Sequence, residues 1–292
     1  MNSVIKKAVF PVAGIGSRFL PATKASPKEM LPIVDKPLIQ YAVEEAISAG
    51  IRELIFVTSS TKRSIEDHFE SNFDLEAKLE AEGKEDLLDI VRQILPKGVS
   101  CAYVRQSDTL GLGHAVLCAK HLVHNQPFAV LLADDLIDGE GQPCLKQMMS
   151  LYEKTHQSII AIQEVSQDET EQYGIVQLNR SDTSSNEIQH IVEKPKRGTA
   201  PSNLGVVGRY LLTPTIFSCL ENTTPGIAGE IQLTDAIEQL LKIEKVYGCI
   251  FKGKRYDCGS KLGYLQATVA YGLKHPEVGN EFKEFLSTAT HA

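Results

Sequence analysis

Hydrophobic and polar positions in the first half of the chain alternate between short apolar runs and longer segments with helical spacing. Apolar runs rich in β-branched residues predict strands, and apolar residues at i, i+3 and i+4 predict helices. Strands are predicted at Ala8–Ala13, Glu53–Thr58, Val99–Arg105 and Phe128–Ala133, and helices at Leu38–Ala49, near Ser64–Phe73 and near His114–Leu122, with an acidic amphipathic stretch at Leu75–Leu95. This alternation predicts a parallel sheet with crossover helices.

The second half has strand patterns that follow one another more closely. They lie at Ile159–Val165, Tyr173–Leu178, Ile188–Val192 and Leu204–Leu211, with a polar loop at Asn179–Asn186 and helical patterns near Pro214, at Glu230–Ile243 and at Lys261–Leu273. Closely spaced strands favour antiparallel pairing. The predicted fold is therefore α/β and Rossmann-like, a doubly wound mixed, mainly parallel sheet with an antiparallel extension.

No internal repeat, low-complexity tract or linker divides the 292 residues. A chain of this length could form one large domain or two ordinary ones. Because nothing in the sequence marks a boundary, a single domain over residues 1–292 is predicted.

Composition and charge narrow the classes of partner. Thirty Lys and Arg residues against 37 Asp and Glu residues give a net charge of −7, so the chain has no overall basic field for nucleic acid or an anionic membrane. No apolar run approaches the ~18 residues of a membrane span. The N-terminal segment lacks the pattern of a secretory signal, which predicts a cytoplasmic protein. The six cysteines form no Cys-x-x-Cys pair, so neither a zinc site nor a disulfide framework is indicated.

A glycine-rich loop, Gly14 to Arg18, follows the first predicted strand. Glycines in this position let backbone N–H groups approach phosphate oxygens, although such pairs also serve as plain turns. A dinucleotide-binding fingerprint would have a third glycine where Phe19 stands, and the Gly-Lys-Ser/Thr text of a Walker A loop is absent. Both of those familiar nucleotide motifs are disfavoured.

Cations follow the glycines in a loop that prolines make stiff. Arg18, Lys24 and Lys28 lie among Pro21, Pro27 and Pro32. Proline restricts its own backbone and that of the preceding residue, so the loop can present these charges in one place. The alternative is a solvated charged loop.

The text from Pro11 to Pro32, PVAGIGSRFLPATKASPKEMLP, resembles the signature of the sugar nucleotidyltransferase family, and within it the bacterial enzymes that transfer a uridylyl group from UTP to glucose 1-phosphate. Further similar segments are LGLGHAVLCA (110–119), LLADDLID (131–138), EKP (193–195), GEIQLTDAI (229–237) and YDCGS (256–260). The resemblance covers nearly the whole chain. Departures are mild, with Ser17 where Thr is common and Ala133 where Pro is common.

The resemblance implies attack of a sugar-1-phosphate oxygen on the α-phosphorus of UTP, with release of pyrophosphate and no covalent enzyme intermediate. In such a reaction the protein aligns two anions and neutralises charge, so no catalytic triad is needed. Arg18, Lys28 and Lys194 are the catalytic cations that the resemblance implies. It also implies residues 1–140 as mainly nucleotide-binding, 141–260 as mainly sugar-phosphate-binding, and 261–292 as helices in a homo-oligomer, a dimer or a tetramer.

An aspartate pair follows the predicted strand that ends at Ala133. Asp134 and Asp135 therefore stand at the carboxyl edge of the sheet, where open α/β folds bind ligands. Magnesium prefers carboxylate and phosphate oxygens, although a turn or helix cap would use an aspartate equally well. The resemblance places Mg²⁺ on Asp134 and Asp257, and Asp135 is expected to point elsewhere.

The remaining site residues are likewise carried over from the resemblance. The nucleotide is expected at Ala13, Gly14, Gly16, Glu29, Gln106 and Gly111, and the sugar phosphate at Gly174, Glu193, Lys194 and Asn203. Gln106 ends a predicted strand, and its amide offers both a donor and an acceptor to uracil. No partner is assigned to Glu29, and His114 is predicted only to pack. Transfer of thymidylyl or another nucleotidyl group, and a non-catalytic regulatory paralogue, are the alternatives.

Overall fold

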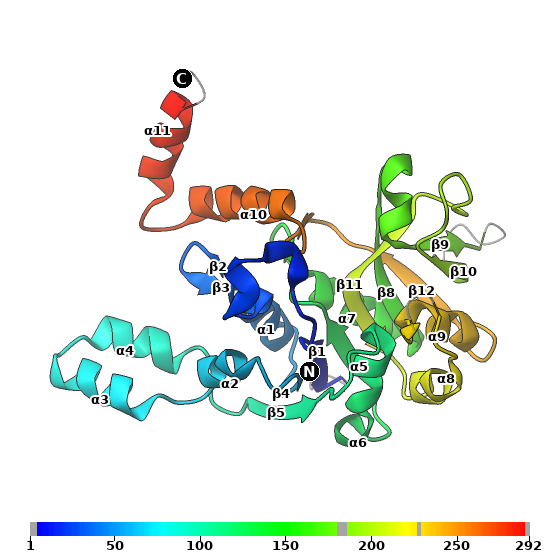
Figure 1. The fold of residues 1–292 in the computed structure, drawn as a ribbon, viewed down its shortest axis with the longest axis horizontal. Coiled ribbons are helices and arrows are strands. Elements are labelled where there is room, and N and C mark those ends of the chain that lie inside the picture. The colour runs from blue at the N-terminus through cyan, green and yellow to red at the C-terminus, as the bar shows by residue number, and fades with distance from the viewer. Residues whose placement is uncertain (1–4, 180–185, 227–228, 290–292) are drawn as a thin grey trace.

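The structure is a computed structural model, and it describes residues 5–179, 186–226 and 229–289 (Figure 1). Within these residues a nine-stranded sheet has the order β10-β9-β11-β6-β1-β4-β5, with β8 paired to β11 and β12 paired to β8. The predicted fold class, a doubly wound mixed α/β sheet with an antiparallel extension, is confirmed.

The parallel half of the sheet is built from the first part of the chain. Its strands are β1 (Lys7–Pro11), β4 (Glu53–Thr58), β5 (Ser100–Arg105) and β6 (Phe128–Leu131), and each pairs in parallel with its neighbours in the order β6-β1-β4-β5. Parallel strands end at the same edge of a sheet, so the segments that follow β1, β5 and β6 meet there.

The antiparallel half is organised by one long strand, β11 (Leu204–Leu212). Its first residues pair with β9 (Gly174–Leu178), its last residues pair with β6, and its other edge pairs with β8 (Ser158–Glu164). The outer strands are β10 (Ile188–Glu193), antiparallel to β9, and β12 (Val246–Ile250), parallel to β8. Because β11 reaches both halves, the carboxyl edge of β6 lies beside the β9 and β10 segments.

Two hydrophobic cores cover the two faces of the sheet. On β1, Phe10 belongs to the core that contains α1 (Leu38–Ser48) and α7 (Cys144–Thr155), whereas Val9 belongs to the core that contains α5 (Leu112–Cys118), α8 (Ile216–Asn222) and α9 (Leu233–Leu240). Successive side chains of a strand point to opposite faces, which explains why this strand is apolar throughout.

Smaller elements surround the sheet. Two short ribbons are formed by β7 (Asp135–Asp138) with β13 (Lys254–Asp257) and by β2 (Pro32–Ile33) with β3 (Lys36–Pro37). In Figure 1, α10 (Lys261–Lys274) and α11 (Gly279–Ala289) extend away from the sheet, and α3 (Phe73–Ala81) and α4 (Glu85–Arg92) form a projecting hairpin. None of the helices in the described part of the chain has the length and apolar character needed to cross a membrane.

Several predicted helices are divided or shorter in the structure. The pattern near Ser64–Phe73 is α2 (Arg63–Phe69) followed by an extended residue before α3, and Gly83, with φ of 67°, separates α3 from α4. The predicted helix near His114–Leu122 is α5 followed by α6 (Lys120–Val123). The apolar period alone does not show such breaks, because it continues across them. Elements α7, β7, β12 and β13 were not predicted, whereas α11 lies within the C-terminal helices expected over residues 261–292.

Candidate active site

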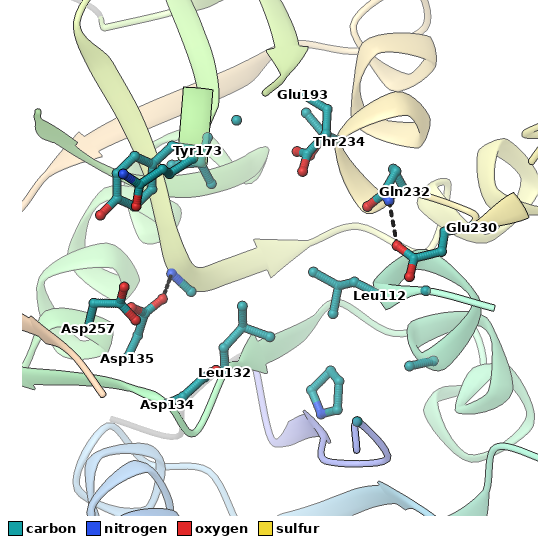
Figure 2. Close-up of a pocket in the computed structure, with 18 of the residues that line it drawn as sticks. Leu112, Leu132, Asp134, Asp135, Tyr173, Glu193, Glu230, Gln232, Thr234 and Asp257 are labelled. Atoms are coloured by element: carbon teal, nitrogen blue, oxygen red, sulfur yellow. Dashed lines mark hydrogen bonds between the residues drawn. The ribbon is translucent and has the colours of Figure 1, made fainter. Parts of the chain in front are cut away.

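A cavity of about 930 Å³ lies where the carboxyl ends of β1, β5 and β6 face the antiparallel half. Figure 2 shows Asp134, Asp135 and Asp257 on one side of it, and Glu193, Thr234, Gln232 and Glu230 on the opposite side. The predicted site residues that line it are Ala13, Gly14, Gly16, Arg18, Lys28, Gln106, Gly111, Asp134, Gly174, Glu193, Lys194 and Asp257. Tertiary folding thus brings most of the predicted residues to one space.

The glycine loop folds back on the cationic segment that follows it. Gly16 has a left-handed backbone, with φ of 71°, and its carbonyl accepts a hydrogen bond from Thr23 Oγ1 at 2.8 Å. A Cβ on Gly16 would stand 3.2 Å from the Cβ of Lys28, so glycine allows both the turn and this close approach. The turn places Lys28 against the loop that the sequence suggested for phosphate.

Lys28 and Asp134 form an ion pair inside the cavity, with Nζ 2.5 Å from Oδ2. Burial alone would lower the pKa of Lys28, but the charges of Asp134 and Glu29 outweigh it, so the pKa is raised. Burial alone would raise the pKa of Asp134, but the charge and hydrogen bond of Lys28 hold it below its ordinary value. Both groups are therefore charged at neutral pH.

The two aspartates expected to hold Mg²⁺ lie close together around Gly259. A Cβ on Gly259 would stand 3.0 Å from Asp257 Oδ1 and 3.1 Å from Asp134 Oδ2, so glycine keeps the space between the two carboxylates open. Arg18 lies beside them, with Nη1 3.5 Å from the Gly259 carbonyl oxygen. Within the described ranges no group of three or more His, Cys, Asp or Glu side chains could hold a metal. Two carboxylates with room for phosphate oxygens and water fit Mg²⁺.

Although it was expected to point elsewhere, Asp135 lines the cavity beside Asp257 (Figure 2), and both of its oxygens are engaged in hydrogen bonds. Oδ2 accepts a hydrogen bond from the backbone N–H of Gly208 at 2.7 Å, and Oδ1 accepts one from Arg255 Nε at 2.5 Å. The buried guanidinium of Arg209 donates to the carbonyls of Leu132 and Asp135 at 2.9 and 2.8 Å. These contacts hold the 132–135 loop, and with it Asp134, in place.

The EKP tripeptide (193–195) forms the wall opposite the aspartates. Glu193 Oε1 lies 3.0 Å from Lys194 Nζ, and Glu193 Oε2 accepts a hydrogen bond from Thr234 Oγ1 at 2.6 Å. A Cβ on Gly174 would be 3.3 Å from the same Oε2. Lys194 has φ of 42° and its backbone N–H donates to the Tyr173 carbonyl at 3.0 Å. A left-handed backbone conformation is uncommon in a residue other than glycine, and here it points to a functional constraint on Lys194.

The end of the cavity near β5 holds the residues expected at the base. The side-chain amide of Gln106 donates to the Gly111 carbonyl at 3.1 Å. Gly111 has φ of 93°, and a Cβ there would stand 2.8 Å from the Cβ of Glu230. The Gly111 turn therefore packs directly on the 230–232 segment, whose Glu230 and Gln232 side chains are hydrogen bonded at 2.8 Å (Figure 2).

Three residues stand differently from what the sequence suggested. Glu29 does not line the cavity, because its buried carboxylate accepts a hydrogen bond from the buried Lys62 ammonium at 2.7 Å. Asn203 also lies outside the cavity lining, and its carbonyl accepts from the Val165 N–H at 2.9 Å. His114 does more than pack, since its Nδ1 lies 3.0 Å from Gln106 Nε2.

Sequence reasoning missed other residues that line the cavity. Arg255 donates a hydrogen bond to the Tyr173 hydroxyl at 3.0 Å and joins the two sides of the site. Burial would lower the pKa of Arg255, but Asp135 and Tyr173 raise it above its ordinary value. Glu230, Gln232 and Thr234 belong to the GEIQLTDAI segment, which was noted without roles. Tyr210 and Arg255 have no motif that could have identified them.

Comparison with known proteins places this site in a family. The sequence model described as "Nucleotidyl transferase" matches residues 7–272, which is most of the chain. The chain belongs to the nucleotidyl transferase family. The predicted resemblance is therefore confirmed, and the protein is a nucleotidyltransferase enzyme.

This nucleotidyl transferase has similar relatives over nearly its full length. It is 51% identical to the UTP–glucose-1-phosphate uridylyltransferase of Staphylococcus epidermidis and 49% identical to that of Bacillus subtilis. Both alignments cover 97% of this chain; they cover 97% of the first relative and 96% of the second. The UTP-bound enzyme of Acinetobacter baumannii superposes with a TM-score of 0.90 at 51% identity, covering 97% of this chain and 98% of that one. A UDP-glucose pyrophosphorylase complexed with UDP-glucose superposes with a TM-score of 0.85 at 50% identity, covering 93% of this chain and 100% of that one.

Proposed function

We propose that the protein transfers a uridylyl group from UTP to glucose 1-phosphate, forming UDP-glucose and pyrophosphate. The observation that carries this proposal is the shared cavity, which is lined by the loop of Gly14 and Gly16, by the pair Asp134 and Asp257, and by Glu193 and Lys194. Relatives whose sequences are about half identical to this chain are named for this activity. Solved structures of two similar proteins are described as bound to UTP and to UDP-glucose, respectively.

The proposed mechanism uses position and charge. The ammonium of Lys194 holds the sugar phosphate on one wall, while Arg18 and Lys28 bind the triphosphate on the other, so an oxygen of the sugar phosphate can attack the α-phosphorus in line. The bond to the α-phosphorus forms as the bond to the pyrophosphate oxygen breaks. Cations preorganised around a phosphorus that gains charge lower the barrier without a covalent intermediate.

Mg²⁺ is the proposed cofactor, and Asp134 and Asp257, on either side of Gly259, are the residues that would hold it. When bound, the ion would neutralise triphosphate charge and orient the phosphate oxygens. Lys28 would have to give up its contact with Asp134 for that carboxylate to hold a metal, and the oxygens of a bound triphosphate would offer its ammonium a new partner.

The decisive experiment is a matrix of UTP, dTTP, CTP, ATP and GTP against several sugar 1-phosphates, read by pyrophosphate release. Turnover should be fastest with UTP and glucose 1-phosphate and should stop in excess chelator. A preference for dTTP would move the enzyme to thymidylyl transfer, and the absence of turnover with every pair would favour a non-catalytic paralogue. Full activity in chelator would remove the metal from the mechanism.

A homo-oligomer, a dimer or a tetramer, is proposed from the C-terminal helices. Leu262 and Leu265 on α10 and Phe285 on α11 are 67%, 60% and 62% exposed. A second copy of the chain would remove such side chains from water. Leu262→Glu combined with Leu265→Glu should reduce the mass measured by light scattering, and an unchanged mass would place the contact elsewhere.

A further inference from the structure

Gln106 is held by two contacts that leave one of its side-chain atoms free for a ligand. The residue is 5% exposed and follows β5, where its backbone N–H donates to the Thr58 carbonyl at 2.9 Å. Its Nε2 lies 3.1 Å from the Gly111 carbonyl oxygen. Because a carbonyl oxygen only accepts, the side-chain atom that faces Gly111 must be the amide nitrogen.

His114 engages the second hydrogen of the same amide nitrogen. Its Nδ1 lies 3.0 Å from Gln106 Nε2. An amide nitrogen donates and does not accept, so Nδ1 must be the acceptor and the ring proton of the neutral imidazole must be on Nε2. That Nε2 lies 3.9 Å from the Sγ of Cys118, one turn further along α5. Burial raises the pKa of the Cys118 thiol, which keeps this neighbour uncharged.

The two contacts decide what Gln106 can offer to a base. With both N–H groups engaged, only Oε1 remains, and no residue in the described part of the chain donates a hydrogen bond to it. Oε1 is not among the side-chain atoms of the described residues that are both fully buried and without a hydrogen-bond partner. The atom is therefore accessible, and Gln106 lines the cavity. The amide therefore presents a hydrogen-bond acceptor, and no donor, to whatever lies against it.

We infer that His114 is a positioning residue that orients the Gln106 amide and thereby selects a pyrimidine base with a hydrogen-bond donor at ring position 3. The inference rests on the proposed function, which places uracil beside Gln106. Uracil carries an N–H at position 3, whereas cytosine carries an acceptor there. A hydrogen-bond acceptor that is fixed on the protein therefore binds the N–H of uracil and repels the acceptor of cytosine.

His114 does not line the cavity and so acts through Gln106. Two substitutions separate orientation from packing. His114→Leu places an apolar methyl group where Nδ1 stands, which removes the acceptor and retains much of the volume. His114→Asn keeps an oxygen acceptor at the position of Nδ1 and loses volume. A residue that only packs would favour leucine over asparagine, whereas an orienting residue would favour asparagine.

The experiment measures kcat/KM with UTP and with CTP, at saturating glucose 1-phosphate, for the wild type and both variants. The ratio of the two values should fall about three- to tenfold in His114→Leu, the effect of one hydrogen bond, and stay within about twofold of wild type in His114→Asn. An unchanged ratio in His114→Leu, or equal falls in both variants, overturns the inference. If His114→Leu does not fold, as seen by circular dichroism, His114→Met takes its place.

The same measurements separate failure of the inference from failure of the proposed function. A wild-type protein that makes no UDP-glucose refutes the proposed function, whatever the variants do. A wild-type protein that prefers UTP, with a preference that His114→Leu does not alter, refutes only the role of His114.

Discussion

Replacing Lys28 by methionine should strengthen metal binding to the substrate-free enzyme while weakening catalysis. In the structure Lys28 Nζ lies 2.5 Å from Asp134 Oδ2, so the ammonium occupies an oxygen that the metal would use. Both side chains are about one quarter exposed, at 24% and 29%, so solvent partly screens the pair. Methionine removes the positive charge and retains a similar unbranched length.

The magnitude follows from Coulomb interaction between the ammonium and the ion. A divalent cation about 2.1 Å from the carboxylate oxygen would lie roughly 4.5 Å from Nζ. At that separation the repulsion is about 2 kcal/mol even with the dielectric constant of water. Removing it should tighten metal binding roughly 30-fold. Turnover should nevertheless fall on the order of 10²-fold, because Lys28 is a proposed partner of the triphosphate.

Isothermal titration of the substrate-free protein with Mn²⁺, which also prefers oxygen ligands, measures the binding change directly. The matched control is Lys24→Met, since Lys24 is exposed and does not line the cavity, yet the net charge changes equally. A Lys28→Met protein that binds Mn²⁺ no more tightly than wild type would show that the metal does not use Asp134.

Three further changes probe other parts of the site. Gly259→Ala should raise the Mg²⁺ concentration needed for half-maximal activity at least tenfold, because the methyl group enters the space between the two carboxylates; an unchanged requirement would place the metal elsewhere. Lys62→Met should lower the free energy of unfolding in urea by about 3 kcal/mol by leaving Glu29 buried without its partner, and adding Glu29→Leu should recover most of the loss; equal stability of the single variant and wild type would contradict this. Lys194→Ala should reduce kcat/KM on the order of 10²-fold, with exposed Lys196→Ala as the control; similar losses in both would remove the proposed role of Lys194.

Local sequence pattern was sufficient for much of the fold because the apolar period reports which faces of an element are buried. The strands of the parallel half, including β1 and β6, were found from short apolar runs, and α10 from its helical period. The same reasoning did not find β7 and β13. Their pairing joins residues about 120 positions apart, as in the contact of Arg255 with Asp135, and no local period indicates such a partner.

The sequence by itself determined the family, through motifs that occur in order along nearly the whole chain, and it indicated the glycine loop and the pair Asp134 and Asp257. Only the tertiary structure decided what adjacent residues do. Lys28 reaches Asp134 in the cavity while its neighbour Glu29 turns inward to Lys62, since successive residues of a 3₁₀ turn point in different directions. A sequence lists side chains in order, but their directions are set by packing between segments far apart in the chain.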